Sequence, residues 1–231
     1  ATRPTMRFVP LKGEDQLDLQ SLHRVRERLV SARTSLIDQL RAVLLERGTV
    51  FPKGRKMLMR RLDELAVEQD ALSPRTRRLV DDLRVEWAAL DRRIEAYDDE
   101  LAEVARRDEG ARRLATIPGI GVINATALVA AVGDASAFAK ARDLSAWLGL
   151  TPRQYTTGGK AKLLGISKRG NRYVRRMLVH GARSCVTHLD RTRDKLGDWL
   201  DALEERMHGN KVTIALANKI ARIAWVILTR P

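Results

Sequence analysis

Hydrophobic residues recur at heptad spacing along the stretch that begins at Pro74. They are separated alternately by four and three residues, and the members are Leu83, Trp87, Leu90, Ile94, Tyr97, Leu101 and Val104. This spacing places them on one stripe of a helix, as in a coiled coil or a long pair of antiparallel helices. Ser73 and Pro74 are typical of a helix start, with Ser as the N-cap and Pro at the first helical position.

An earlier helix, predicted to begin at Asp15 and to stop at Gly48, carries a matching stripe. Its members are Leu22, Val25, Leu29, Ala32, Leu36, Leu40 and Val43. The two helices can fold back on each other within one chain or pair between chains. A Trp and a Tyr in the second stripe favour a mixed bundle over a uniform dimeric zipper. We expect an intramolecular helical hairpin that also dimerises.

Glycine, serine and proline divide the rest of the chain into shorter elements. Gly110 is expected to end or bend the long helix. Residues 150–166 contain strand formers followed by the turn signal Gly158-Gly159, which predicts a small β-hairpin or an extended loop. Ser167 is predicted to cap the next helix. Helices are predicted over residues 56–68, 111–116, 124–132, 141–148, 168–189 and 211–229. The fold class is therefore mainly α.

Composition limits the classes of partner and site. The 231 residues suffice for one or two domains, and we expect a linker over 1–13, a helical coiled-coil dimerisation region over 14–109 and a C-terminal domain over 110–231. The net charge of +14 and the pI of about 10.6 favour a polyanionic partner. Cys185 is the single cysteine, which excludes an internal disulfide, and its apolar helical context predicts a core residue. No membrane span and no metal site are predicted.

The motif Ile-Pro-Gly-Ile-Gly at residues 117–121 precedes an alanine-rich helix. It has the form of a helix-hairpin-helix. Gly119 and Gly121 allow a tight bend and expose backbone N–H groups at the start of the next helix. Unpaired donors and the positive end of the helix dipole coincide there, which suits a phosphate. The alternative is that the turn simply joins two packed helices.

A basic segment follows the motif. Residues 151–189 hold nine Lys or Arg and no Asp or Glu, in a chain otherwise rich in carboxylates. A basic run is often only a solvated face, but its position after a phosphate-compatible hairpin predicts contact with a nucleic-acid backbone. The candidate binding residues are Gly119, Gly121, Arg153, Lys160, Lys162, Lys168, Arg169, Arg172, Arg175 and Arg176.

Hydroxyl groups in the predicted hairpin are the candidate chemistry. Thr156 and Thr157 precede Gly158-Gly159 and lie among the cations. A hydroxyl on such a loop can attack a phosphodiester while the cations stabilise the developing charge. The alternative is that these hydroxyls only form hydrogen bonds with phosphates.

Two stretches, residues 7–48 and 117–183, carry a resemblance to a known family. The order GLTPRQ, GGK, GISKRGN and RR within the second stretch is its most specific part. The chain resembles the DEDD-type insertion-sequence transposases, a group that is related to the pilin-gene invertases and includes bridge-RNA-guided recombinases. The resemblance implies an N-terminal RuvC-like domain with four acidic metal ligands, a coiled-coil region and a helix-hairpin-helix transposase domain.

The resemblance also implies a division of chemistry. The RuvC-like domain would precede Ala1, so its metal ligands match no residue here; Mg²⁺ is expected only with that domain, and no cofactor is expected in this chain. The family's C-terminal domain supplies a serine nucleophile that links covalently to DNA. The matching loop here reads Thr156-Thr157, so the resemblance places the nucleophile at one of these threonines, whose β-methyl group crowds the hydroxyl and stiffens χ1.

We therefore expect the DNA-binding and oligomerisation portion of an insertion-sequence transposase or site-specific recombinase, inactive alone without the RuvC-like domain. The expected partners are DNA, a guide RNA and further copies of the chain in a dimer or tetramer, in the bacterial cytoplasm and on the nucleoid when bound. The alternative is a stand-alone, non-catalytic helix-hairpin-helix nucleic-acid-binding fragment. A purely structural coiled-coil adaptor would bind no nucleic acid, and the charge of +14 argues against it.

Overall fold

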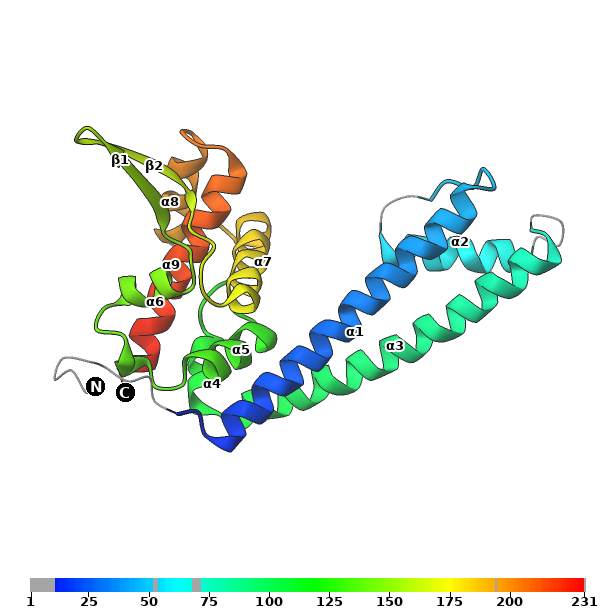
Figure 1. The fold of residues 1–231 in the computed structure, drawn as a ribbon, viewed down its shortest axis with the longest axis horizontal. Helices are drawn as coiled ribbons and strands as arrows, with labels where there is room; N and C mark the ends of the chain where they lie inside the picture. The colour runs from blue at the N-terminus through cyan, green and yellow to red at the C-terminus, as the bar shows by residue number, and fades with distance from the viewer. Residues whose placement is uncertain (1–10, 52–53, 68–71, 194, 231) are drawn as a thin grey trace. The chain divides into compact units, whose positions relative to one another are not determined.

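The chain is mainly α, as predicted, with a single antiparallel pair of strands among the described residues (Figure 1). The computed structural model describes residues 11–51, 54–67, 72–193 and 195–230. Most of the predicted linker, residues 1–10, lies outside this range, as does residue 68 of a predicted helix. Two compact units are present: Leu22–Asp99, and Glu100–Pro231 together with Ala1–Ser21.

The unit Leu22–Asp99 is built from α2 (Arg55–Val67) and from most of two long helices, α1 (Glu14–Leu45) and α3 (Pro74–Arg107). Its core consists of leucines from all three helices around Trp87, which is 1% exposed. The stripe predicted on α3 is buried here at Trp87, Leu90 and Ile94. On α1 the buried position after Leu40 is Leu44, not the predicted Val43, because a 3.6-residue helix drifts from a strict heptad.

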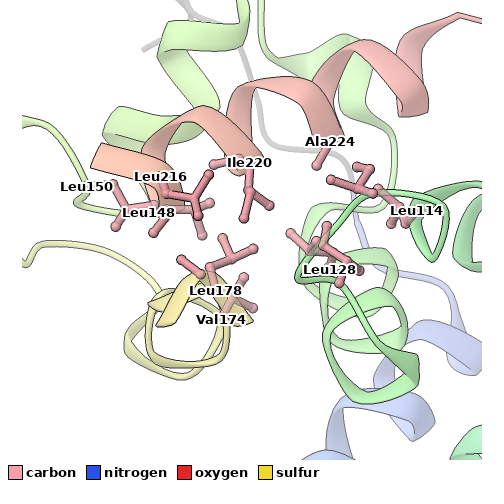
Figure 2. Packing of buried hydrophobic residues seen from close by; sticks show 14 of the residues in the cluster. Leu114, Leu128, Leu148, Leu150, Val174, Leu178, Leu216, Ile220 and Ala224 are labelled. Carbon is pink, nitrogen blue, oxygen red and sulfur yellow. The ribbon is translucent and has the colours of Figure 1, made fainter. Parts of the chain in front are cut away.

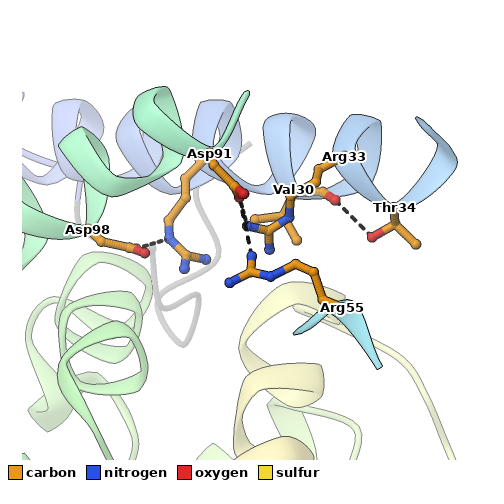
Figure 3. Close-up of polar contacts among 7 residues, drawn as sticks. Val30, Arg33, Thr34, Arg55, Asp91 and Asp98 are labelled. Carbon is orange, nitrogen blue, oxygen red and sulfur yellow. Dashed lines mark hydrogen bonds and ion pairs between the residues drawn. The ribbon is translucent and has the colours of Figure 1, made fainter. Parts of the chain in front are cut away.

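Ion pairs fix the relative direction of α1 and α3. Arg26 pairs with Asp98, and Arg33 Nη1 lies 2.6 Å from Asp91 Oδ1 (Figure 3). Moving along α1 from Arg26 to Arg33 moves backward along α3 from Asp98 to Asp91, so the two helices run antiparallel within one chain. Arg55 Nη1 lies 3.2 Å from the same Asp91 oxygen and ties α2 to this pair.

The second unit is assembled around α9 (Gly209–Thr229), whose buried residues include Leu216, Ile220 and Ala224 (Figure 2). Around it lie α4 (Glu109–Leu114), α5 (Val122–Val132), the 3-10 helix η1 (Ala135–Ala137), α6 (Ala141–Trp147), β1 (Pro152–Thr157), β2 (Lys160–Ile166), α7 (Arg172–His188) and α8 (Lys195–Glu204). By length and composition α9 is apolar enough to cross a membrane, but its apolar face packs against this core.

Two predicted helix boundaries are wrong. The long helix ends at Arg107, not at Gly110, because the Asp108 carboxylate accepts a hydrogen bond from the Ala111 N–H at 2.6 Å and starts α4 anew. Gly110 lies within α4.

The helix predicted from Lys168 begins at Arg172, and its cap is Asn171 rather than Ser167. The Asn171 side chain accepts from the Val174 N–H at 3.1 Å. Lys168 has a φ of +57° and cannot be a helical residue. The helix α8 was not predicted from the sequence.

Candidate nucleic-acid interface

The turn between α4 and α5, residues 117–121, rests directly on α7. Gly119 has a φ of +87°, and a Cβ atom added there would lie 2.9 Å from the carbonyl oxygen of Gly181. A Cβ added at Gly181 would lie 1.9 Å from the Gly119 oxygen. The Asn124 amide also donates to the Gly119 oxygen, at 3.0 Å. Both glycines are therefore needed for a contact of backbone on backbone that holds the start of α5 beside α7.

Gly121 is the N-cap of α5 and is exposed, and no side chain caps it. Its φ of −96° is available to any residue, and a Cβ there would meet nothing within 4 Å. The first N–H groups of a helix have no acceptor within the helix. They carry the positive end of the dipole, and here they lie next to exposed Val122. The start of α5 therefore has the geometry to accept an anion from solvent.

The strands β1 and β2 form the hairpin that was one of the two alternatives for residues 150–166. Gly158 and Gly159 turn the chain with φ angles of +55° and +76°, as tight hairpin turns require. The cross-strand partners are Tyr155 with Lys162, Thr157 with Lys160, Gln154 with Leu163 and Thr156 with Ala161. The register shifts between Pro152 and Gln154, so Arg153 lies at an irregularity of the ladder.

Directly opposed residues share a face of a sheet, and successive residues alternate between faces. One face, called here the lysine face, therefore carries Tyr155, Thr157, Lys160 and Lys162. The other face carries Gln154, Thr156, Ala161 and Leu163. The two threonines thus point to opposite sides, and the Thr156 hydroxyl accepts a hydrogen bond from the Gln154 amide at 3.0 Å.

The loop from β2 to α7 carries Lys168 and Arg169, both exposed, and its backbone is seated on the end of α6. The Lys168 N–H donates to the Gly149 oxygen at 3.1 Å, and a Cβ added at Gly149 would lie 2.2 Å from the Arg169 oxygen. This loop therefore holds its two cationic side chains on a fixed backbone.

Arg175 is used inside the fold. Its Nη1 donates to the carbonyl oxygens of Leu148 at 2.9 Å and Arg169 at 2.7 Å. Burial, and then the charge of Arg172, lower the pKa of Arg175 from its ordinary value. Of the arginines predicted to bind nucleic acid, this one has a clear structural role.

The exposed side of α7 forms a cationic stripe. Val174, Leu178, Ala182 and Cys185 are buried, which places the predicted core residue Cys185 in the core. Exposed or half-exposed on the other side are Arg172, Arg176, His180 and Arg183, with the Arg176 guanidinium 5.5 Å from the centre of the Tyr173 ring. His180 and Arg183 were not among the candidates. Their helical spacing from Arg172 and Arg176 could have identified them.

Residues 151–189 contain no carboxylate side chain, and the next one along the chain is Asp190. Among the residues that the structure describes, no ion pair is formed by Arg153, Lys160, Lys162, Lys168, Arg169 or Arg172. Arg191 instead pairs with Asp201 and Glu204 of α8, and its hydrogen bond to Glu204 lowers the pKa of that carboxyl group. Within the described ranges no three His, Cys, Asp or Glu side chains lie close enough to hold a metal ion.

Comparison with known proteins assigns the family. Residues 111–196 match the model described as the Transposase IS116/IS110/IS902 family. The chain is 44% identical over its whole length to a transposase of insertion sequence element IS1111A from Coxiella burnetii, of which it spans 64%. Over its whole length the chain is also 42% identical to a probable family 20 transposase from Pseudomonas aeruginosa, and it covers 69% of that protein. It is 43% identical over 99% of its length to the transposase of IS1328 from Yersinia enterocolitica, of which it spans 68%. The chain therefore belongs to the IS116/IS110/IS902 family of transposases.

Proposed function

We propose that the unit of Glu100–Pro231 grips the phosphate backbone of DNA as part of an insertion-sequence transposase. The observation that carries this proposal is that α5 starts without a side-chain cap and that exposed cations follow it in a segment without Asp or Glu. The cations extend from the hairpin through Lys168 and Arg169 to α7. The contact between Gly119 and Gly181 keeps the start of α5 next to α7. A backbone phosphate could then be shared by helix N–H groups and neighbouring cations.

The α4–turn–α5 segment acts in this proposal as a helix-hairpin-helix motif. Gly121 supplies the open helix start, whereas Gly119 positions it through its packing on α7. Of the ten residues proposed to bind nucleic acid, Gly119 and Arg175 therefore serve mainly to place the others. The remaining eight present exposed or half-exposed groups to the ligand.

Thr156 and Thr157 are the proposed nucleophile candidates, and the faces of the hairpin favour Thr157. Thr157 shares its face with Lys160 and Lys162, whose charges would stabilise a phosphorane-like transition state. In the proposed step the hydroxyl oxygen gives up its proton and bonds to phosphorus, the phosphodiester P–O bond breaks, and the departing oxygen takes up a proton.

The other proposals concern the whole protein. We propose that it belongs to the DEDD, bridge-RNA-guided group, that a RuvC-like domain supplies the metal ligands, and that a guide RNA takes part. We also propose that α1 and α3 act as a coiled coil in assembling a dimer or tetramer, with the division 1–13, 14–109 and 110–231 as functional parts. A bacterial cytoplasmic location, on the nucleoid when bound, follows from the same proposal. The second candidate function is a stand-alone, non-catalytic nucleic-acid-binding fragment, which the same exposed cations and the open start of α5 would also serve.

The test of backbone gripping is the salt dependence of binding to a DNA duplex, measured by fluorescence anisotropy. In Lys168→Gln/Arg169→Gln the slope of log K against log salt should fall in magnitude by about 1.8, because each lost phosphate contact removes about 0.9. The matched control is Arg92→Gln/Arg93→Gln, which removes two exposed cations from α3 and should leave the slope unchanged. Equal slopes for the wild type and the loop variant would overturn the proposal. Strand transfer by the full-length parent, with and without Thr157→Val, separates a transposase from a binding fragment.

A further inference from the structure

The β1–β2 hairpin has almost no core of its own. Every residue of both strands is exposed except Ile166, which is partly buried against the core of the unit at the base of the hairpin. Figure 1 shows the two strands projecting away from the helices of their unit. Such a two-stranded hairpin is only marginally stable in water by itself. The large Tyr155 side chain, on the lysine face, nevertheless remains 61% exposed. A hairpin of this kind fits a surface that becomes covered when a partner binds.

The charge of the hairpin defines the partner. It carries Arg153, Lys160 and Lys162 and no carboxylate, and within the described part of the chain these cations have no ion-pair partner. Both lysines lie on the lysine face, opposite Thr157 and Tyr155. A face with two cations, a hydroxyl and a phenol matches a polyanion that also offers hydrogen-bond acceptors. A nucleic acid has both properties.

The dimensions distinguish duplex DNA from duplex RNA. Strands of six and seven residues span about 20 Å, at roughly 3.3 Å per residue, which corresponds to about six base pairs. The major groove of B-form DNA is about 12 Å wide and admits a two-stranded ribbon. The major groove of A-form RNA is deep and too narrow for side chains to read. The shape of the hairpin therefore favours B-form DNA.

We propose that β1–β2 is a ribbon that enters the major groove of duplex DNA with its lysine face toward the DNA. This inference rests on the proposed DNA-binding function and adds to it the groove, the face and the form of the nucleic acid. The Lys160–Thr157 pair at the tip and the Tyr155–Lys162 pair behind it face the DNA, while Leu163 faces away. Binding then covers strands whose residues, apart from Ile166, are exposed.

The test compares Lys160→Gln/Lys162→Gln with two control variants. Arg206→Gln/Lys211→Gln removes two exposed cations elsewhere in the same unit, and Leu163→Thr alters the opposite face of the hairpin. Binding is measured by anisotropy on four probes: a 20-base-pair DNA duplex, the same duplex with glucosylated hydroxymethylcytosine filling its major groove, the same sequence as an RNA duplex, and single-stranded DNA. Circular dichroism confirms that each variant is folded.

On the plain DNA duplex, the salt slope of the hairpin variant should be smaller in magnitude by about 1.8, so a fourfold rise in salt should weaken its binding roughly tenfold less than it weakens that of the wild type. Both controls should match the wild type. On glucosylated DNA and on duplex RNA, the wild type should bind as weakly as the hairpin variant binds plain DNA. The substitutions should cause no further loss of affinity on these two probes. Equal losses on all duplex probes would mean that the lysines touch only the backbone, and a loss confined to single strands would indicate stacking on Tyr155. Either result overturns the groove proposal.

The outcome is separable from that of the proposed function. If Lys168→Gln/Arg169→Gln reduces the salt slope and the hairpin variant does not, the unit grips DNA without the hairpin in the groove. If the hairpin variant alone has an effect, DNA binding persists through the ribbon, and the proposed backbone contacts of Lys168, Arg169 and the start of α5 are wrong.

Discussion

Replacing Gly181 by alanine should destabilise the second unit although alanine is the better helix former. Gly181 lies inside α7, where Gly→Ala normally stabilises by about 1 kcal/mol. Here the new Cβ would lie 1.9 Å from the Gly119 oxygen and 2.6 Å from the Asn124 amide nitrogen. Ordinary contact begins near 3.4 Å, so turn and helix must separate by roughly 1.5 Å. Because the obstructing atom belongs to the backbone, the overpacking cost should lie near the upper end of the usual range, about 3 kcal/mol.

The net expectation is a loss of about 2 kcal/mol in the free energy of unfolding, measured by urea denaturation. Affinity for a DNA duplex should fall as well, since the start of α5 would shift away from α7. Gly209→Ala is the matched control, because it also places alanine in a helix but with no atom within 4 Å of the new Cβ. Its free energy of unfolding should stay within about 0.5 kcal/mol of the wild type. A Gly181→Ala protein as stable as the wild type would refute the reasoning.

Three further predictions concern stability. Burial, and then the charge of Arg26, lower the pKa of His23 from 6.5 to about 4, so His23 stabilises the fold fully above pH 6.5. That stability should be lost as the pH falls from 6.5 to 4. The urea midpoint of His23→Gln should depend less on pH over this range than that of the wild type. Asn171→Ala should cost about 1 kcal/mol in thermal or urea unfolding through loss of the α7 cap, while Ser167→Ala costs little; the reverse order would contradict the assignment. Asp91→Ala should lower the stability of its unit by about 1 kcal/mol, and less at high salt, because two arginines lose their partner; a loss independent of salt would contradict this.

Sequence pattern was sufficient where local signals were strong and repeated. The heptad stripes located both long helices, and strand formers around Gly158-Gly159 gave the hairpin as one of two alternatives. The cap of α7 was misassigned because Ser167 and Asn171 are both good cap residues. A bond between segments decided it: the Ser167 N–H donates to the Thr151 oxygen at 2.9 Å, which keeps Ser167 in the base of the hairpin.

The candidate site shows the same limit. Composition identified the cations but not which of them serve the fold, since the role of Arg175 depends on carbonyl groups of Leu148 and Arg169. The packing role of Gly119 depends on a glycine 62 positions later in the chain, Gly181, and no local motif contains that information. α8 was missed because its Gly197 resembles a helix breaker. A Cβ there would lie 2.1 Å from the Arg191 oxygen, so glycine is required for close packing.

The central position of α9 has a consequence for synthesis on the ribosome. α4, α6 and α7 all pack on this helix, and the Trp225 indole N–H also donates to the carbonyl oxygens of Ala135 at 3.2 Å and Phe138 at 3.0 Å. At roughly 5–20 residues per second, the apolar face of α4 waits on the order of ten seconds for α9 to be made, and that of α8 waits about one to five seconds. The nascent second unit is therefore exposed to aggregation and to chaperones until α9 is made, whereas the unit Leu22–Asp99 can complete its core earlier.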